Sequence, residues 1–88
     1  MIPRKIKIGR KQYTVHQCKQ RRHINGRIFY ELQTIEIQPR DPRDMLGTFW
    51  HEVTHAILYD MKDPRYRDEA FVAGFSQRLH KAIQSARF

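Results

Sequence analysis

Cysteine is almost absent from this chain of 88 residues, which contains Cys18 and no other. An internal disulfide is therefore excluded, and a reducing compartment fits the chain better than an oxidising one. No run approaches the roughly 18 apolar residues that a membrane-spanning helix needs. The first residues, MIPRKIKIGRK, carry charges where a signal peptide needs an apolar stretch. We therefore expect a cytoplasmic protein without a membrane segment.

Acidic residues are also scarce, since nine Asp and Glu face 17 Lys and Arg and give a formal net charge of +8. Residues 1–43 hold eleven Lys or Arg against three Asp or Glu, whereas residues 44–88 hold six of each. The whole positive excess thus lies in the first half. Such a block can bind nucleic acid or an acidic partner. A basic sheet surface without a specific ligand explains it at least as well, because no nucleic-acid-binding motif accompanies it.

The first half of the chain alternates apolar and polar residues with the period of a β-strand. Turn signals, Gly9 to Lys11 and Asn25-Gly26, separate the alternating segments. The segments that we expect to form strands are residues 4–8, 12–19, 27–31 and 33–38. This pattern predicts a three- or four-stranded, mainly antiparallel sheet within residues 1–40.

The second half has the signals of two helices. Asp41 can cap a first helix and Pro42 suits its first position, so we expect a helix over residues 41–60. Asp63-Pro64 repeats this signal and predicts a second helix over about residues 64–84. The residues with helical spacing that we expect to be buried are Leu46, Phe49, Trp50, Val53 and Ile57 in the first helix, and Phe71, Phe75, Leu79 and Ile83, together with Val72 and Ala82, in the second. The chain is therefore predicted to be one small α+β domain.

The first helix contains the sequence His51-Glu52-Val53-Thr54-His55, an H-E-x-x-H motif. Residues four apart lie on one face of a helix, so His51 and His55 can bind one metal ion. Glu52 lies one residue further round, where it can act as a general base on a water molecule. The apolar stripe lies beside the two histidines and favours a site at the border between core and solvent.

A catalytic zinc ion typically has three protein ligands, so one more ligand is needed. Our choice is Glu69, in the first turns of the second helix, with Asp68 as the runner-up. Two antiparallel helices joined by a short loop would bring Glu69 beside the first helix. His80 lies roughly 16 Å further along the same helix, which makes it a poor candidate. The other candidates are Asp63, Asp60 and Cys18.

HEVTH followed by DEAFVAGFSQRL resembles the gluzincin-type metallopeptidases, whose third zinc ligand is a glutamate on a later helix. It is most similar to minigluzincins and to the compact H-E-x-x-H proteins of tailed phages, and EAFVAGFS resembles the corresponding helix of ImmA/IrrE-like peptidases. The resemblance covers residues 34–83 and includes TIEIQ, which resembles the strand lining the cleft. It implies a zincin-like fold, one zinc ion held by His51, His55 and Glu69, and phage origin.

The function that we expect is therefore that of a zinc metallopeptidase with a protein or peptide substrate and Glu52 as base. Thr34–Gln38 could pair with an extended substrate at the sheet edge. The residue that stabilises the transition state is not identified, and Tyr59, Tyr66 and His80 are the possibilities. The alternative is a module in which the basic sheet binds nucleic acid or protein and the zinc is structural or vestigial. The sequence leaves the oligomeric state open.

Overall fold

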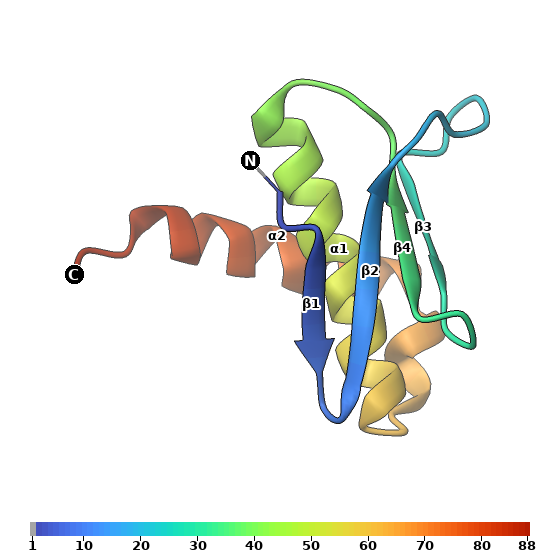
Figure 1. Ribbon diagram of the computed structural model, residues 1–88. Coiled ribbons are helices and arrows are strands. Elements are labelled where there is room, and N and C mark those ends of the chain that lie inside the picture. Colours follow the sequence, from blue (N-terminus) through green and yellow to red (C-terminus); the bar gives the residue numbers. More distant parts are fainter. Residues whose placement is uncertain (1) are drawn as a thin grey trace.

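The computed structural model describes residues 2–88 as a four-stranded sheet followed by helices (Figure 1). The elements in chain order are β1 (Lys5–Ile8), β2 (Lys11–Gln17), β3 (Gly26–Phe29), β4 (Thr34–Ile37), α1 (Pro42–Asp60), the 3-10 helix η1 (Pro64–Arg67) and α2 (Glu69–Ser85). Helix α1 packs against the sheet, and α2 packs against α1 and η1 without contacting a described strand. The protein is thus a small α+β domain, as predicted. None of the described helices is long and apolar enough to cross a membrane.

The sheet is mixed and has the strand order β1-β2-β4-β3. The pairs β1–β2 and β3–β4 are antiparallel, as predicted, whereas β2 and β4 are parallel. Parallel neighbours need a long connection, and residues 18–33, which include β3, provide it. Strand β4 is therefore paired on both sides. The prediction that Thr34–Gln38 offers a free edge to a substrate was wrong, because β3 is the edge strand on that side.

The turn predicted at Asn25-Gly26 lies earlier in the chain. Ile24 N donates a hydrogen bond to Arg21 O at 3.0 Å, and His23 has a φ of 69°. Gly26 instead begins β3, opposite Ile37. A Cβ on Gly26 would lie 2.6 Å from Thr48 Cγ2. The glycine therefore serves the close approach of α1 to β3 and not a tight turn.

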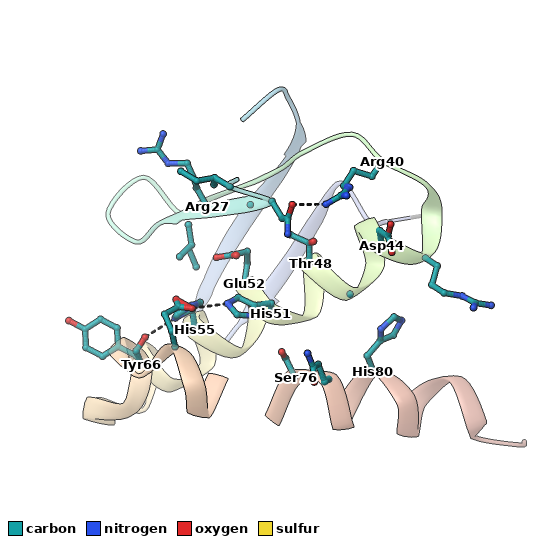
Figure 2. A pocket seen from close by; sticks show the side chains of 18 of the residues that line it. Arg27, Arg40, Asp44, Thr48, His51, Glu52, His55, Tyr66, Ser76 and His80 are labelled. Atoms are coloured by element: carbon teal, nitrogen blue, oxygen red, sulfur yellow. Dashed lines mark hydrogen bonds and ion pairs between the residues drawn. The ribbon is translucent and has the colours of Figure 1, made fainter. Parts of the chain in front are cut away.

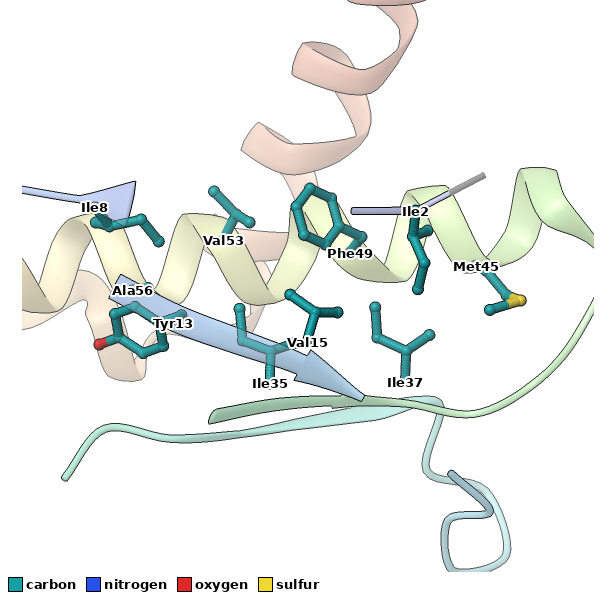
Figure 3. Close-up of a cluster of buried hydrophobic side chains, with 10 residues drawn as sticks. All are labelled: Ile2, Ile8, Tyr13, Val15, Ile35, Ile37, Met45, Phe49, Val53 and Ala56. Atoms are coloured by element: carbon teal, nitrogen blue, oxygen red, sulfur yellow. The ribbon is translucent and has the colours of Figure 1, made fainter. Parts of the chain in front are cut away.

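The hydrophobic core lies between the sheet and α1 (Figure 3). The alternation in β2 and β4 turns Tyr13, Val15, Ile35 and Ile37 inward, as predicted. Helix α1 meets them with Met45, Phe49, Val53 and Ala56. The prediction was wrong for Ile57, which is 40% exposed. It lies one residue past the sheet-facing stripe, and Ala56 occupies the buried position.

The second helix begins later than predicted. The Asp63 carboxylate accepts a hydrogen bond from Arg65 N and caps η1, whereas the Asp68 carboxylate accepts one from Phe71 N and caps α2. The Asp63-Pro64 signal, which was predicted to start α2, therefore starts the short 3-10 helix η1 instead. The predicted apolar face of α2 is borne out in part, because Val72 is buried and Phe71 and Leu79 are half-buried, whereas Phe75, Ala82 and Ile83 are exposed. His80 still lies against Gly47 of α1, whereas the last turn of α2 extends beyond α1 and is exposed (Figure 1).

Candidate metal centre

Helix α1 positions the first two candidate ligands. The Asp41 carboxylate accepts a hydrogen bond from Asp44 N at 3.1 Å, and Pro42 occupies the first turn, so the helix starts where the sequence predicts. His51 and His55 follow one turn apart, with ring centroids 5.0 Å from each other. Because the sheet-facing stripe is occupied by apolar side chains, both rings are directed toward the start of α2. His55 is buried and His51 is half-buried.

Helix α2 supplies the third candidate ligand. Its cap fixes Glu69 as the first helical residue, directly opposite the two histidines. The Glu69 Oε2 atom lies 3.1 Å from His51 Nε2, and its Oε1 atom lies 2.8 Å from His55 Nε2. One potential ligand atom from each of these three residues lies within 4.8 Å of the other two. The structure therefore brings together the three residues that the sequence selected, of which Figure 2 labels His51 and His55.

The other candidates lie elsewhere or have another role. The carboxylates of Asp68 and Asp63 cap helices. The Asp60 carboxylate lies against Gly9, and Cys18 is in hydrogen-bond contact with Gln20. His80 lines the same cleft as the three residues but does not belong to their cluster. Among the described residues, this cluster is the one group of His, Cys, Asp and Glu that could hold a metal ion.

The hydrogen bond of His55 fits a metal ligand. His55 Nδ1 lies 2.7 Å from the carbonyl oxygen of Tyr66, which can only accept, so Nδ1 carries the proton. Nε2 then turns its lone pair toward the Glu69 carboxylate, which also only accepts. Two acceptors 2.8 Å apart require a proton or a cation between them. A backbone carbonyl that fixes the tautomer in this way is a common partner of a metal-binding histidine.

The distances in the cluster are compatible with zinc. Zinc bonds of about 2.0–2.2 Å in tetrahedral geometry separate the ligand atoms by about 3.4 Å. The two carboxylate-to-histidine distances are shorter than this value, and the 4.8 Å limit of the whole group is longer. Rotations of the Glu69 side chain, which is 69% exposed, can accommodate the difference. The donor set of two imidazoles and one carboxylate also suits zinc.

Glu52 lies deep in the same cleft. It is 6% exposed, and its Oε2 lies 3.3 Å from the position that a Cβ on Gly26 would occupy. Burial, together with the nearby charge of Glu69, raises the pKa of Glu52 to about 8. The carboxyl group is therefore mostly protonated at neutral pH when no cation is near. A positive charge at the three candidate ligands would favour its ionised form.

An aromatic cluster lies at the η1 end of the site. The ring of Tyr30 stacks on Tyr59 at a centroid distance of 4.1 Å and meets Tyr66 edge to face at 5.6 Å. Tyr30 and Tyr66 line the cleft, whereas Tyr59 does not. The Tyr66 hydroxyl accepts a hydrogen bond from Arg67 Nε at 2.7 Å. Burial and the negative charges of Glu52 and Glu69 raise the pKa of Tyr30.

Tyr30 is the cleft residue that the sequence analysis passed over. It falls in the segment 27–31, which the sequence predicts as a strand without a functional role, and it lies just after β3. One signal could have selected Tyr30. It ends a strand segment and lies on the same face as Gly26 and Ile28, which also line the cleft. That signal is usable only when β3 is known to be the strand beside α1.

The chain matches no protein-family model, no curated protein and no solved structure.

Proposed function

We propose that this protein is a zinc-dependent metallopeptidase. The observation that carries the proposal is the convergence of His51, His55 and Glu69, on two different helices, beside the buried carboxyl group of Glu52. The resemblance of residues 34–83 to gluzincin-type peptidases agrees with the same assignment. A structural zinc site does not require a carboxyl group beside its ligands, whereas a catalytic site needs a general base there.

The residues have distinct roles in the proposed reaction. A zinc ion at this site would supply a Lewis acid that polarises the peptide carbonyl and increases the acidity of the attacking water. Glu52 accepts the proton of that water and returns it to the leaving amine. Its burial keeps bulk water away from the proton that it carries. The Tyr66 carbonyl holds the His55 ring, so that Nε2 faces the site.

The edge of β3 is the candidate binding surface for the substrate backbone. Strand β3 is paired with β4 on one side only, and Gly26 and Ile28 line the cleft. An extended peptide could continue the sheet there through backbone hydrogen bonds. This assignment replaces the one made for Thr34–Gln38, whose two sides are occupied.

Tyr30 is the candidate donor for the oxyanion. Its hydroxyl lies close enough to Glu52 and Glu69 for their charges to raise its pKa, which keeps the phenol protonated and able to donate. Replacement of Tyr30 by Phe should lower kcat about 100-fold and leave the zinc content unchanged. Tyr59→Phe is the matched control, because Tyr59 stacks on Tyr30 outside the cleft. Equal activities of the two variants would remove Tyr30 from the mechanism.

The metal content of purified variants tests the site itself. One zinc ion per chain is expected in the wild type, and a loss in both His55→Ala and Glu69→Ala. Asp68→Asn is the control, since asparagine is also a good helix cap. Glu52→Gln should retain zinc and lose hydrolysis of a peptide library. Zinc retained in Glu69→Ala, or hydrolysis retained in Glu52→Gln, would contradict the proposal.

A further inference from the structure

One end of the cleft is rich in positive charge. Arg40, just before α1, Arg43, in its first turn, and Lys81, on α2, line the cleft at the end away from Tyr66 (Figure 2 labels Arg40, His80 and Tyr66). A second hollow adjoins this end and shares His23, Ile24, Asn25 and Arg40 with it. We name as the basic rim the lysines and arginines of this region: Lys19, Arg21, Arg22, Arg40, Arg43 and Lys81.

The charges of the basic rim are poorly neutralised. Within residues 2–88, no member of the rim forms an ion pair with a carboxylate. The second hollow has no acidic residue in its lining, and Asp44 is the one acidic residue at this end of the cleft. Like charges gathered in a concave surface repel one another and attract anions. The rim therefore forms an electrostatic site for an acidic ligand.

Arg40 is held in position within this site. Its Nη1 donates a hydrogen bond of 2.7 Å to Asn25 Oδ1, and the backbone oxygen of Asn25 accepts one of 2.8 Å from Gln38 N. The guanidinium group is thus fixed between the loop before β3 and the segment before α1. Its remaining N–H groups are available for a carboxylate, which arginine can bind in a bidentate manner.

The distance between the candidate metal centre and the basic rim determines which residues of a bound peptide would reach the rim. Arg43 precedes His51 by eight residues on the same helix, a rise of about 12 Å. An extended peptide covers about 3.3 Å per residue. Side chains about four residues from the cleaved bond would therefore lie beside Arg43 and Arg40.

The lining of the rim favours a peptide over nucleic acid. Proteins that bind single strands combine basic grooves with aromatic side chains on which the bases stack. No Phe, Tyr or Trp lines the second hollow, and the aromatic residues of the cleft, Tyr30 and Tyr66, belong to its other end. Carboxylate side chains need charge and hydrogen-bond donors alone, which the rim provides.

We propose that the basic rim binds an acidic segment of the peptide substrate, about four residues from the cleaved bond. The position of the acidic segment is given relative to the cleaved bond and therefore rests on the proposed peptidase function. Binding of an acidic peptide to the basic rim is independent of zinc. Acidic proteins or acidic peptides are therefore the proposed substrate class.

Binding of fluorescent decapeptides to the metal-free protein, in EDTA at low salt, tests the rim without catalysis. A peptide with four glutamates at one end should bind at least tenfold more tightly than its glutamine counterpart. Arg40→Gln/Arg43→Gln/Lys81→Gln should abolish the difference. Lys5→Gln/Lys7→Gln/Arg10→Gln removes the same charge from the distant β1 hairpin and should preserve it. Equal loss in both triple variants, or equal binding of the two peptides, would overturn the proposal, with circular dichroism as the check of folding.

Two further measurements distinguish acidic-peptide binding at the basic rim from nucleic-acid binding and from the peptidase function alone. A ten-nucleotide thymidine oligonucleotide that binds the rim more tightly than the glutamate peptide would overturn the peptide assignment. If the zinc-loaded protein cleaves peptides without preference for acidic segments, the proposed role of the basic rim is overturned and the proposed peptidase function stands. Tight rim-dependent binding of the glutamate peptide without cleavage would remove the peptidase function and support the rim as a peptide-binding site.

Discussion

Helices α1 and α2 each contribute to the candidate metal centre, but they are held in very different ways. Helix α1 lies between the sheet and α2 and has eight buried residues. Helix α2 has two, and Phe75 and Ile83 on its surface are 50% and 43% exposed. Two candidate ligands therefore belong to a helix fixed by the core, and the third belongs to a helix with little apolar burial. Helix α2 packs along α1 through Val72 and Ser76, and a metal ion at its first turn would add to this attachment.

The largest expected difference comes from the same substitution in the two helices. Phe49→Ala should cost about 3–5 kcal/mol of unfolding free energy, since Phe49 is 1% exposed in the core between α1 and the sheet. Phe75→Ala should change it by less than about 0.5 kcal/mol. Urea denaturation followed by circular dichroism measures both. A cost for Phe75 close to that for Phe49 would show that α2 is packed more firmly than its exposure indicates.

Zinc should reduce the difference between the helices, because it would join Glu69 to His51 and His55. Saturation at 100 times the dissociation constant should add about 3 kcal/mol to the free energy of unfolding. Amide hydrogen exchange should slow in the first turns of α2 more than in the centre of α1. Glu69→Gln provides the control and should lose both effects. Uniform protection of the two helices, or none, would contradict the role of zinc in attaching α2.

The bounds of α1 could be predicted from the sequence, whereas the faces of α1 and α2 that other elements cover could be predicted only in part. The cap of α1 at Asp41, its proline and its H-E-x-x-H spacing are signals within a few residues, and all of them placed the helix correctly. Ile57 was misplaced because helical spacing alone does not determine how wide a face the sheet covers. The exposed Phe75 shows the same limit for α2, since an apolar stripe predicts burial only where a partner exists.

The sheet and the cleft required information from distant parts of the chain. The order β1-β2-β4-β3 depends on the insertion of β4 beside β2, and alternation within a strand does not specify its neighbours. Asn25-Gly26 has the composition of a tight turn, but the contact of Gly26 with Thr48 decided its role. Glu69 was found because a short connection restricts where a second helix can lie. Tyr30 and the basic rim were missed because they become neighbours of the site only in the folded chain.

Glu52 provides a pH-dependent test within α1, since it is the acidic residue buried in that helix. Its pKa in the folded protein, about 8, lies above the ordinary value of 4.5, so the folded state favours the protonated form. Stability from this group is present below pH 4.5 and is lost as the pH rises through 8. In EDTA, Glu52→Gln should therefore match the wild type near pH 4 and exceed it by up to about 5 kcal/mol at pH 9, since each unit of pKa shift corresponds to about 1.4 kcal/mol. Parallel stability curves for the two proteins would show that Glu52 ionises normally.

The smallest expected effect concerns the two helix caps, Asp41 on α1 and Asp68 on α2. Each carboxylate accepts one backbone N–H bond, at 3.1 Å and 3.0 Å, so Ala at either position should cost about 1 kcal/mol of unfolding free energy.

The effects of the two cap substitutions on zinc affinity should differ, because Asp68 adjoins Glu69 whereas Asp41 lies ten residues before His51. Asp68→Ala should weaken zinc binding about fivefold by fraying the first turn of α2, and Asp41→Ala should leave it unchanged. Asp68→Asn should restore the affinity. Equal zinc affinities in the two alanine variants would show that Glu69 is held by contacts other than its helix start, and α2 would then be as firmly placed at the site as α1.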